Sequence, residues 1–228
     1  MLLDEEKPTV ALHVPRKFRR GQLGHDEAMS VKSGLQLLDL IGQRKPVEGA
    51  KMLDMGCGVK VAQALYERGS PQKLYVGLDV YKPMIRYMRN ALSGNAKYRF
   101  KAVDFHNEKY NKDGVRMDEV DDFPVRRRDF DILTMFSVIT HMVPDDARDV
   151  LKKLRAHAAD DAVLIFSTFV STEQEEDFVD LVPEKPLFKA SYRKDFLETI
   201  IGECGWRIEE FHPIIKRVIT NHYVCRPA

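Results

Sequence analysis

The sequence predicts an α/β fold: a doubly wound, mainly parallel sheet of seven strands with helices on both faces. Short apolar runs rich in β-branched residues alternate with segments of helical periodicity, the pattern that parallel sheets with crossover helices produce. Glycine or proline stands at most of the boundaries between these segments. Only a few residues join the last two predicted strands, which suits a hairpin and makes one strand near the C-terminus antiparallel.

No linker, repeat or low-complexity tract divides the 228 residues, a length that suits one large α/β domain. We expect a single domain over residues 1–228. Within it, residues 1–48 would form an arm and a helix that cover the ligand-binding side, and residues 49–228 would form the core.

The first strand and the first core helix flank a turn with two glycines. The run KMLDM at residues 51–55 has the pattern of a short buried strand. The segment VKVAQALYERGS that follows the turn is predicted to be a helix, which Gly69 is placed to end. KLYVGLDV at 73–80 is then the second strand, and KPMIRYMRNAL at 82–92 is a helix with Pro83 in its first turn.

The remaining elements repeat this alternation. KYRFKAVD at 97–104, residues 130–136 and DAVLIFSTFV at 161–170 are the third, fourth and fifth strands. Two helices with apolar residues at helical spacing are predicted around 147–154 and near 191–204, and the last two strands are predicted at 206–213 and 217–224. Residues 171–192 are long and mixed in composition, which is typical of a loop that covers a site.

The composition disfavours several functional classes. The formal net charge is +1, so the chain as a whole is not attracted to nucleic acid or anionic lipid. No apolar run reaches about 18 residues, so we expect no membrane span, and the acidic start does not resemble a signal peptide, which makes a cytoplasmic location the expectation. The three cysteines are far apart and predict neither a disulfide framework nor a metal-binding pair.

Acids and glycines fall where the predicted strands end. The turn from Gly56 to Gly58 permits unusual backbone angles and lets a ligand approach the backbone closely. Ligands of doubly wound sheets bind beyond the carboxyl ends of the strands, where Asp54, Asp79 and Asp104 are expected. Asp79 follows Gly58 at the spacing from which an acid reaches a ribose diol. Each acid alone could equally cap a helix, but three at successive strand ends favour a nucleoside pocket.

Two kinds of nucleoside cofactor then compete. A dinucleotide fingerprint needs a small residue where Val61 stands, and Asp54 would repel a pyrophosphate. A cofactor that carries sulfonium and ammonium groups but no phosphate is attracted by the same acid. Cys57 is expected to be a small, partly buried residue of the turn rather than a metal ligand. Lys60, which stands where a third glycine is usual, is expected to point its side chain to solvent.

Several motifs together resemble those of a known family. The segments LDMGCG, VGLDV, KAVDF and FDILTMFSVITHM are similar to the motifs of class I S-adenosylmethionine-dependent methyltransferases, which have a Rossmann-like fold. The resemblance runs from about residue 49 to residue 169. It is closer to a bacterial-type subgroup with D-x-x-N-x-x-Y-N after the third strand and SVFTHM after the fourth, which here are DFHNEKYN at 104–111 and SVITHM at 137–142.

The resemblance implies a role for each matching residue. The methionyl part and the ribose of S-adenosylmethionine would be held by Asp54, Gly56, Cys57 and Gly58. Asp79 would bind the ribose hydroxyls, and Val80 would lie against the adenine. Asp104 would accept a hydrogen bond from the adenine amino group, Phe105 would lie beside the ring, and Phe136 would lie beside the methionine. The product would be S-adenosylhomocysteine, and no metal is expected.

His141 is the candidate catalytic residue. It follows the fourth strand, near the expected place of the methyl group, and a histidine titrates near neutrality. As a general base it would accelerate transfer by about 10² to 10⁴-fold. The alternative is that His141 caps or supports the next helix. His106 and His25 are weaker candidates, because the first is expected to brace the adenine side and the second lies in the arm.

The predicted function is methyl transfer to an oxygen or nitrogen atom of a small molecule, such as a sugar, a lipid-linked glycan or an acid. A protein-directed methyltransferase and a non-enzymatic regulator that binds S-adenosylmethionine are the alternatives. No nucleic acid partner is expected, because the sequence has no RNA-binding module. The basic run at residues 16–20 is either a solvated leader or a lid that also steers an anionic acceptor.

Overall fold

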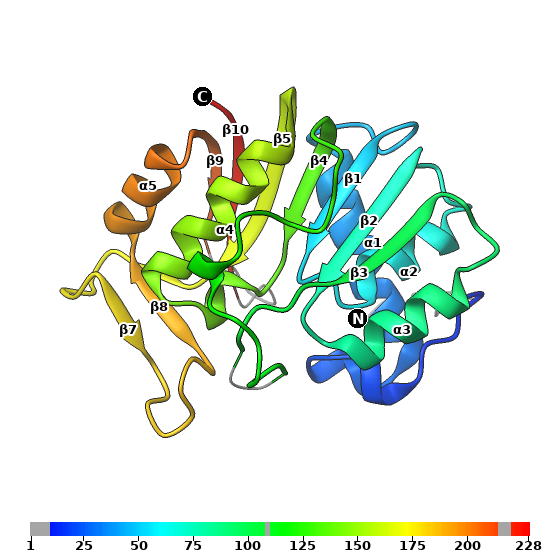
Figure 1. Cartoon of the computed structure of the whole chain (residues 1–228), viewed down its shortest axis with the longest axis horizontal. Helices are drawn as coiled ribbons and strands as arrows, with labels where there is room; N and C mark the ends of the chain where they lie inside the picture. Colours follow the sequence, from blue (N-terminus) through cyan, green and yellow to red (C-terminus); the bar gives the residue numbers. More distant parts are fainter. Residues whose placement is uncertain (1–9, 108–109, 214–219) are drawn as a thin grey trace, which may run out of the picture.

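Residues 10–107, 110–213 and 220–228 are described by the computed structural model shown in Figure 1. Within them, seven strands form the main sheet. In spatial order these are β3 (Tyr98–Ala102), β2 (Leu74–Asp79), β1 (Lys51–Met55), β4 (Phe130–Met135), β5 (Ala158–Thr168), β10 (Asn221–Pro227) and β9 (Trp206–His212). The first five run parallel, and β10 is antiparallel to both of its neighbours. The predicted fold class is confirmed, including the antiparallel strand near the C-terminus.

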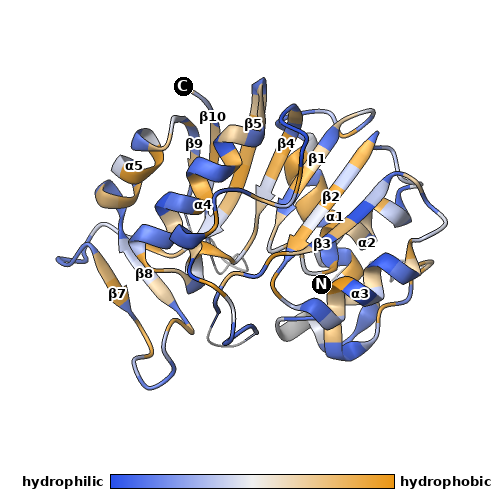
Figure 2. Ribbon diagram, viewed as in Figure 1, coloured by the Kyte–Doolittle hydropathy of each residue, from blue (hydrophilic) through white to orange (hydrophobic). Residues whose placement is uncertain are grey.

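Helices cover both faces of this sheet (Figure 1). One face packs against α1 (Glu27–Gly42), α2 (Lys60–Glu67) and α3 (Lys82–Ala91), and the other against α4 (Pro144–His157) and α5 (Lys194–Glu203). Figure 2 shows that the central strands are apolar along most of their length, as expected of strands covered on both sides. The apolar residues predicted to face the core from α4 are fully buried: Ala147, Val150, Leu151 and Leu154.

The order of the strands determines at which edge of the sheet a ligand would bind. The chain runs outward through β1, β2 and β3 and then returns to β4 on the other side of β1. The sheet therefore has its topological switch point between β1 and β4, where a crevice for ligands forms beyond the carboxyl ends of the strands. In Figure 1 the N-terminal arm lies at the lower right and the β7–β8 hairpin at the lower left, on the side toward which the parallel strands point.

The segment predicted as a long loop contains a second, small sheet. Its strands are β6 (Val170–Ser171), β8 (Ala190–Arg193) and β7 (Phe178–Asp180), in that spatial order. The last helix was predicted to begin near residue 191 but begins at Lys194. Residues 190–193 are extended because they pair with β6 and β7, and Ala190 and Tyr192 are fully buried. The last predicted strand lies partly outside the described residues, and its described part is β10.

Helix α1 lies against the start of α2 at Gly34. A Cβ atom added to Gly34 would lie 2.5 Å from the carbonyl oxygen of Lys60 and 3.3 Å from the Cβ of Ala64. A helix interior ordinarily prefers alanine to glycine by about 1 kcal/mol. The glycine therefore serves the close approach of the two helices and not the helix itself.

We expect Gly34→Ala to lower the free energy of unfolding by about 1 to 3 kcal/mol, because α1 must move away from α2. Gly42→Ala in the same helix is the matched control, since no atom lies within 4 Å of its Cβ position. It should be neutral or stabilising by less than about 1 kcal/mol. Urea unfolding of both variants is the measurement, and equal values for the two would contradict the close-approach argument.

Candidate functional site

The two glycines of the turn after β1 have different purposes. Both have left-handed backbone angles, with φ of 65° at Gly56 and 49° at Gly58. A Cβ on Gly56 would lie 2.2 Å from Cγ2 of Val138, so this glycine lets the turn pack against the segment after β4. No atom lies within 4 Å of a Cβ position on Gly58. The turn thus leaves open space over the backbone of Gly58, as a closely approaching ligand requires.

Asp79 borders this turn from the end of β2. It is only 5% exposed, and its Oδ2 accepts a hydrogen bond from the Gly58 N–H at 3.1 Å. Its Oδ1 accepts from the N–H of Tyr81, the residue before α3, at 2.9 Å. The carboxylate therefore ties the glycine turn to the start of α3. Since a carboxylate has about four acceptor positions, it retains capacity for further donors.

Asp54 lies beneath the turn, where strands β2 and β4 each supply a hydroxyl group. Its Oδ2 accepts from the Tyr75 hydroxyl at 2.7 Å, and its Oδ1 accepts from the Thr134 hydroxyl at 2.7 Å. Burial, helped by the negative charge of Asp79 and opposed by the two hydrogen bonds, raises the pKa of this carboxyl to about 7. A direct contact of Asp54 with the ligand stays a prediction.

The neighbouring turn residues are packed into the core. Cys57 is 6% exposed, and its Sγ would lie 2.9 Å from a Cβ on Gly77 in β2. Burial raises the pKa of its thiol, so it has the character of a packing residue. Lys60 was expected to point to solvent, and this is wrong. Its ammonium is half-buried and donates to the Ser33 hydroxyl at 3.2 Å, because α1 crosses the start of α2 at this point.

The residues predicted to bind adenine lie at the ends of β2 and β3. Val80 is half-buried and packs against the core. Asp104 is exposed and accepts from Lys82 Nζ at 2.6 Å and from Asn111 Nδ2 at 3.2 Å, and the Lys82 hydrogen bond lowers the pKa of its carboxyl. The ring of Phe105 is 2% exposed and lies against Phe123, so its side chain belongs to the core. Residues 108–109 of the DFHNEKYN motif lie outside the described residues.

The segment after β4 forms the other half of the site. Phe136 is half-buried and lies 6.2 Å from the ring of His222, measured between ring centroids. Ser137 has a φ of 57°, which is unusual for a residue with a side chain, and its N–H donates to Ser167 Oγ at 2.8 Å. Such backbone conformations persist where the surrounding structure holds them, often at functional sites.

His141 ends a short 3₁₀ turn (Ile139–His141) and contacts the small second sheet. Its Nδ1 lies 3.0 Å from the carbonyl oxygen of Leu187, a residue of the β7–β8 connection with a φ of 55°. A carbonyl oxygen only accepts hydrogen bonds, so Nδ1 carries the proton. In the neutral ring Nε2 then carries the lone pair. Sequence reasoning did not identify Leu187, because its partner His141 is 46 residues away along the chain.

Other features of the described residues bear on the site. The ranges 10–107, 110–213 and 220–228 contain no cluster of three or more His, Cys, Asp or Glu residues suited to a metal ion. No helix among the same ranges has the length and apolar character needed to cross a membrane.

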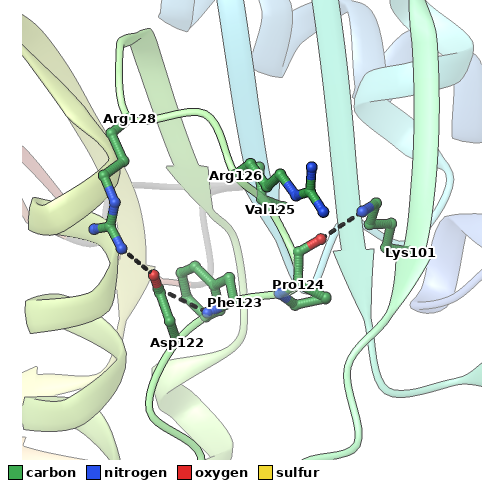
Figure 3. Close-up of a pocket in the computed structure, with 7 residues that line it drawn as sticks. All are labelled: Lys101, Asp122, Phe123, Pro124, Val125, Arg126 and Arg128. Atoms are coloured by element: carbon green, nitrogen blue, oxygen red, sulfur yellow. Dashed lines mark hydrogen bonds and ion pairs between the residues drawn. The ribbon is translucent and has the colours of Figure 1, made fainter.

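An open hollow of about 540 Å³ lies elsewhere (Figure 3). It is lined by Lys101, Asp122, Phe123, Pro124, Val125, Arg126 and Arg128. Arg128 is paired with Asp122 at 2.5 Å, and Lys101 donates to the carbonyl oxygen of Pro124. None of the site residues predicted from the sequence lines this hollow, which lies beside the segment leading into β4 and not beyond the carboxyl ends of β1 and β4.

The raised pKa of Asp54 predicts how stability depends on pH. The neutral carboxyl is favoured in the folded state, so the contribution of Asp54 is fully present below pH about 4 and is lost as the pH rises through about 7. A difference of about three pKa units corresponds to about 4 kcal/mol. We expect Asp54→Asn, which cannot ionise, to gain stability over the wild type by up to this amount between pH 4 and pH 8.

Melting temperatures of both proteins across this pH range would test the prediction. Asp160→Asn is the control and should follow the wild-type curve, because Asp160 is exposed. A constant difference between Asp54→Asn and the wild type from pH 4 to pH 8 would mean that Asp54 is ionised throughout.

Comparison with known proteins finds a methyltransferase domain in this chain. A family model described as a methyltransferase domain matches residues 53–164. An S-adenosylmethionine-dependent methyltransferase from Clostridium acetobutylicum superposes with a TM-score of 0.61 at 13% identity, over 87% of this chain and 92% of that chain. Magnesium protoporphyrin IX methyltransferase from Synechocystis, solved with bound S-adenosylmethionine, superposes with a TM-score of 0.59 at 14% identity, over 93% of this chain and 90% of that chain.

A TehB-like methyltransferase from Corynebacterium glutamicum gives a TM-score of 0.55 at 17% identity, over 86% of this chain and 87% of that chain. At these identities the similarity to the solved structures is one of fold, and it agrees with the fold described above. The family model covers the elements that carry the glycine turn, Asp79 and His141. The chain therefore carries a methyltransferase domain on the fold of the S-adenosylmethionine-dependent methyltransferases, which supports an enzyme.

Proposed function

We propose that the enzyme transfers the methyl group of S-adenosylmethionine to an oxygen or nitrogen atom of a small molecule, with His141 as the general base. The observation that carries this proposal is the hydrogen bond between His141 Nδ1 and the Leu187 carbonyl. This hydrogen bond favours the tautomer in which Nε2 can accept a proton. His141 follows β4, one of the two strands at the topological switch point.

The residues of the glycine turn fit the cofactor. S-adenosylmethionine supplies a methyl group on a sulfonium sulfur, which leaves as a neutral thioether. Asp79 has unused acceptor capacity beside the open space at Gly58 and would bind the ribose hydroxyls. Asp79 beside the turn would attract the cationic part of the molecule, and Asp54 beneath the turn would add to this attraction in its ionised form. Val80, Asp104 and Phe105 would border the adenine, and Phe136 the methionine.

The other half of the site would receive the acceptor. The acceptor oxygen or nitrogen atom would be held here to receive the methyl group, and its proton would pass to His141 Nε2. The β7–β8 connection carries two exposed apolar side chains, Leu181 and Phe188. These would contact an apolar part of the acceptor, which favours a sugar, lipid-linked glycan or acid with such a part over a fully polar molecule.

The test has two stages. Calorimetry with S-adenosylmethionine, S-adenosylhomocysteine and NAD should show binding of the first two only. Transfer of labelled methyl from S-adenosylmethionine is then followed in a panel of hydroxylated, aminated and carboxylated small molecules and in denatured protein extract. Label in a small molecule is the expected outcome. Label in protein alone would contradict the proposal and indicate a protein-directed methyltransferase. Binding of S-adenosylmethionine without any transfer would contradict it and indicate a regulatory role.

A further inference from the structure

The N-terminal arm is fixed against α2 and α3. The ring of Phe18 is 4% exposed and packs on Tyr81 and Tyr87, with centroid distances of 6.0 and 5.2 Å. The Tyr87 hydroxyl donates to the carbonyl oxygen of His13 at 2.7 Å. Closer to the N-terminus, the N–H groups of residues 11 and 12 donate to the carboxylate of Glu67, the last residue of α2. The arm therefore forms part of the folded molecule over the binding edge and is not a solvated leader.

Two arginines of this arm carry buried nitrogen atoms without hydrogen-bond partners. Among the described residues, Arg19 Nε, Arg19 Nη1 and Arg20 Nη2 are buried atoms of this kind. Arg20 stacks its guanidinium on Tyr110 at 3.5 Å from the ring centroid and lies 5.0 Å from that of Tyr81. Stacking satisfies the face of the guanidinium but not its N–H groups. Buried N–H groups without a hydrogen-bond partner are costly unless an acceptor reaches them.

The described residues do not supply that acceptor. Glu27 interacts electrostatically with Arg19, but its carboxylate accepts from the Val14 N–H at 2.5 Å and lies 3.3 Å from Nδ1 of His13. Gln63 Oε1 and Ser30 Oγ are also buried without partners. Gln63 bonds to the arm at the Leu12 carbonyl and to Glu27. Five of the eight such atoms in the described part of the chain thus belong to the arm, to α1 and to α2.

This cluster borders the cofactor half of the site. Tyr81, beneath Arg20, donates its N–H to Asp79, and Gln63 lies in the helix that begins directly after the glycine turn. A bound ligand would therefore lie within reach of both arginines. The unsatisfied groups of Arg19 and Arg20 are all donors, and charged donors in a fork geometry match a carboxylate or a phosphate.

We propose that Arg19 and Arg20 form an anion subsite that binds a carboxylate or phosphate group of a ligand held in the site. The inference rests on the proposed function, because it takes the ligand to be the cofactor or the methyl acceptor. Two sources supply such a group: the carboxylate at the methionyl end of the cofactor, and an acidic group on the acceptor. The free enzyme keeps the subsite at a cost in stability, which ligand binding offsets.

The double variant Arg19→Met, Arg20→Met tests this through two readouts. Methionine keeps apolar volume while removing the unsatisfied donors, so the melting temperature of the ligand-free protein should stay unchanged or rise. Calorimetry is run in parallel with S-adenosylhomocysteine and with 5′-methylthioadenosine, which lacks the carboxylate, and thermal shift with inorganic phosphate. Lys17→Met is the matched control, since Lys17 belongs to the same arm and is exposed.

If the cofactor carboxylate fills the subsite, the double variant loses about 10-fold or more in affinity for S-adenosylhomocysteine but less than about threefold for 5′-methylthioadenosine. If the acceptor fills it, both affinities hold, and stabilisation by phosphate is seen in the wild type and lost in the variant. A lower melting temperature with unchanged ligand responses would make the arginines structural and overturn the proposal. Failure of the wild type to bind S-adenosylhomocysteine would instead contradict the proposed function.

Discussion

Alanine in place of Asp79 is expected to weaken the binding of S-adenosylhomocysteine by about 10² to 10⁴-fold. The wild-type carboxylate would accept hydrogen bonds from two ribose hydroxyls, and each hydrogen bond to a charged group contributes about 1.5 to 3 kcal/mol. Alanine also releases the Gly58 N–H, which Asp79 holds at 3.1 Å, so the glycine turn loses its link to the start of α3. Calorimetry on the folded variant gives the affinity directly.

Asp79→Asn separates these two effects. The amide oxygen can still accept from Tyr81 or from Gly58, but the side chain can no longer accept from two hydroxyl groups as a carboxylate does. The affinity of Asp79→Asn for S-adenosylhomocysteine should fall nearly as far as that of Asp79→Ala, while its melting temperature changes little. Because 5′-methylthioadenosine keeps the ribose, substitutions of Asp79 should weaken its binding as much as they weaken the binding of S-adenosylhomocysteine. Wild-type affinity in the asparagine variant would leave Asp79 only the role of holding the turn.

The strands and helices of the sheet core could be predicted from the sequence because their signals are local. Strand β1 has the predicted bounds, and β2 and β4 differ from their predicted segments by only one or two residues. These strands are buried on both faces, so each is a nearly continuous apolar run that ends at a charged residue or a turn. The order of residues along the chain also places Asp79 at a strand end and His141 in the segment after β4 without any knowledge of contacts.

The features that were missed depend on contacts between distant segments. The strands of the second sheet have two to four residues each, too few for a periodic pattern. Lys60 is turned inward by α1, which no pattern around residue 60 indicates. The hydroxyl partners of Asp54 are 21 and 80 residues away, at Tyr75 and Thr134. One signal was present: an acid inside a buried strand needs hydrogen-bond donors, and buried strands that carry Tyr or Thr can supply them.

The two halves of the site differ in how they are held. Asp54 and Asp79 are fixed by groups of the main sheet and of the turns beside it, so the cofactor half belongs to the most buried part of the fold. His141 is held from outside the main sheet, by Leu187 in the β7–β8 connection. Asp180 in turn accepts from the Leu187 N–H at 2.8 Å. Changes that displace the Leu187 carbonyl should therefore alter catalysis and acceptor choice while leaving the affinity for the cofactor unchanged.

The largest effect on turnover is expected at His141. With an acceptor found by transfer of labelled methyl, His141→Ala should lower the single-turnover rate by about 10² to 10⁴-fold, since an acceptor that must lose its proton no longer has a positioned base. The affinity for S-adenosylhomocysteine should hold within about twofold. The wild-type rate should rise with pH through the neutral range as the histidine loses its proton, and this rise should be absent in the variant.

Leu187→Gly is the matched variant for this test. Glycine adopts a φ of 55° without strain and keeps the carbonyl group that accepts from His141 Nδ1, so the rate should stay near that of the wild type. Nitrogen chemical shifts of the His141 ring should show the Nδ1–H tautomer in both proteins. If His141 instead supports the fold, alanine would lower the melting temperature while each folded molecule keeps nearly normal turnover. A stable, fully active His141→Ala enzyme would leave methyl transfer to proximity and orientation alone, as expected for an acceptor that reaches the site already deprotonated.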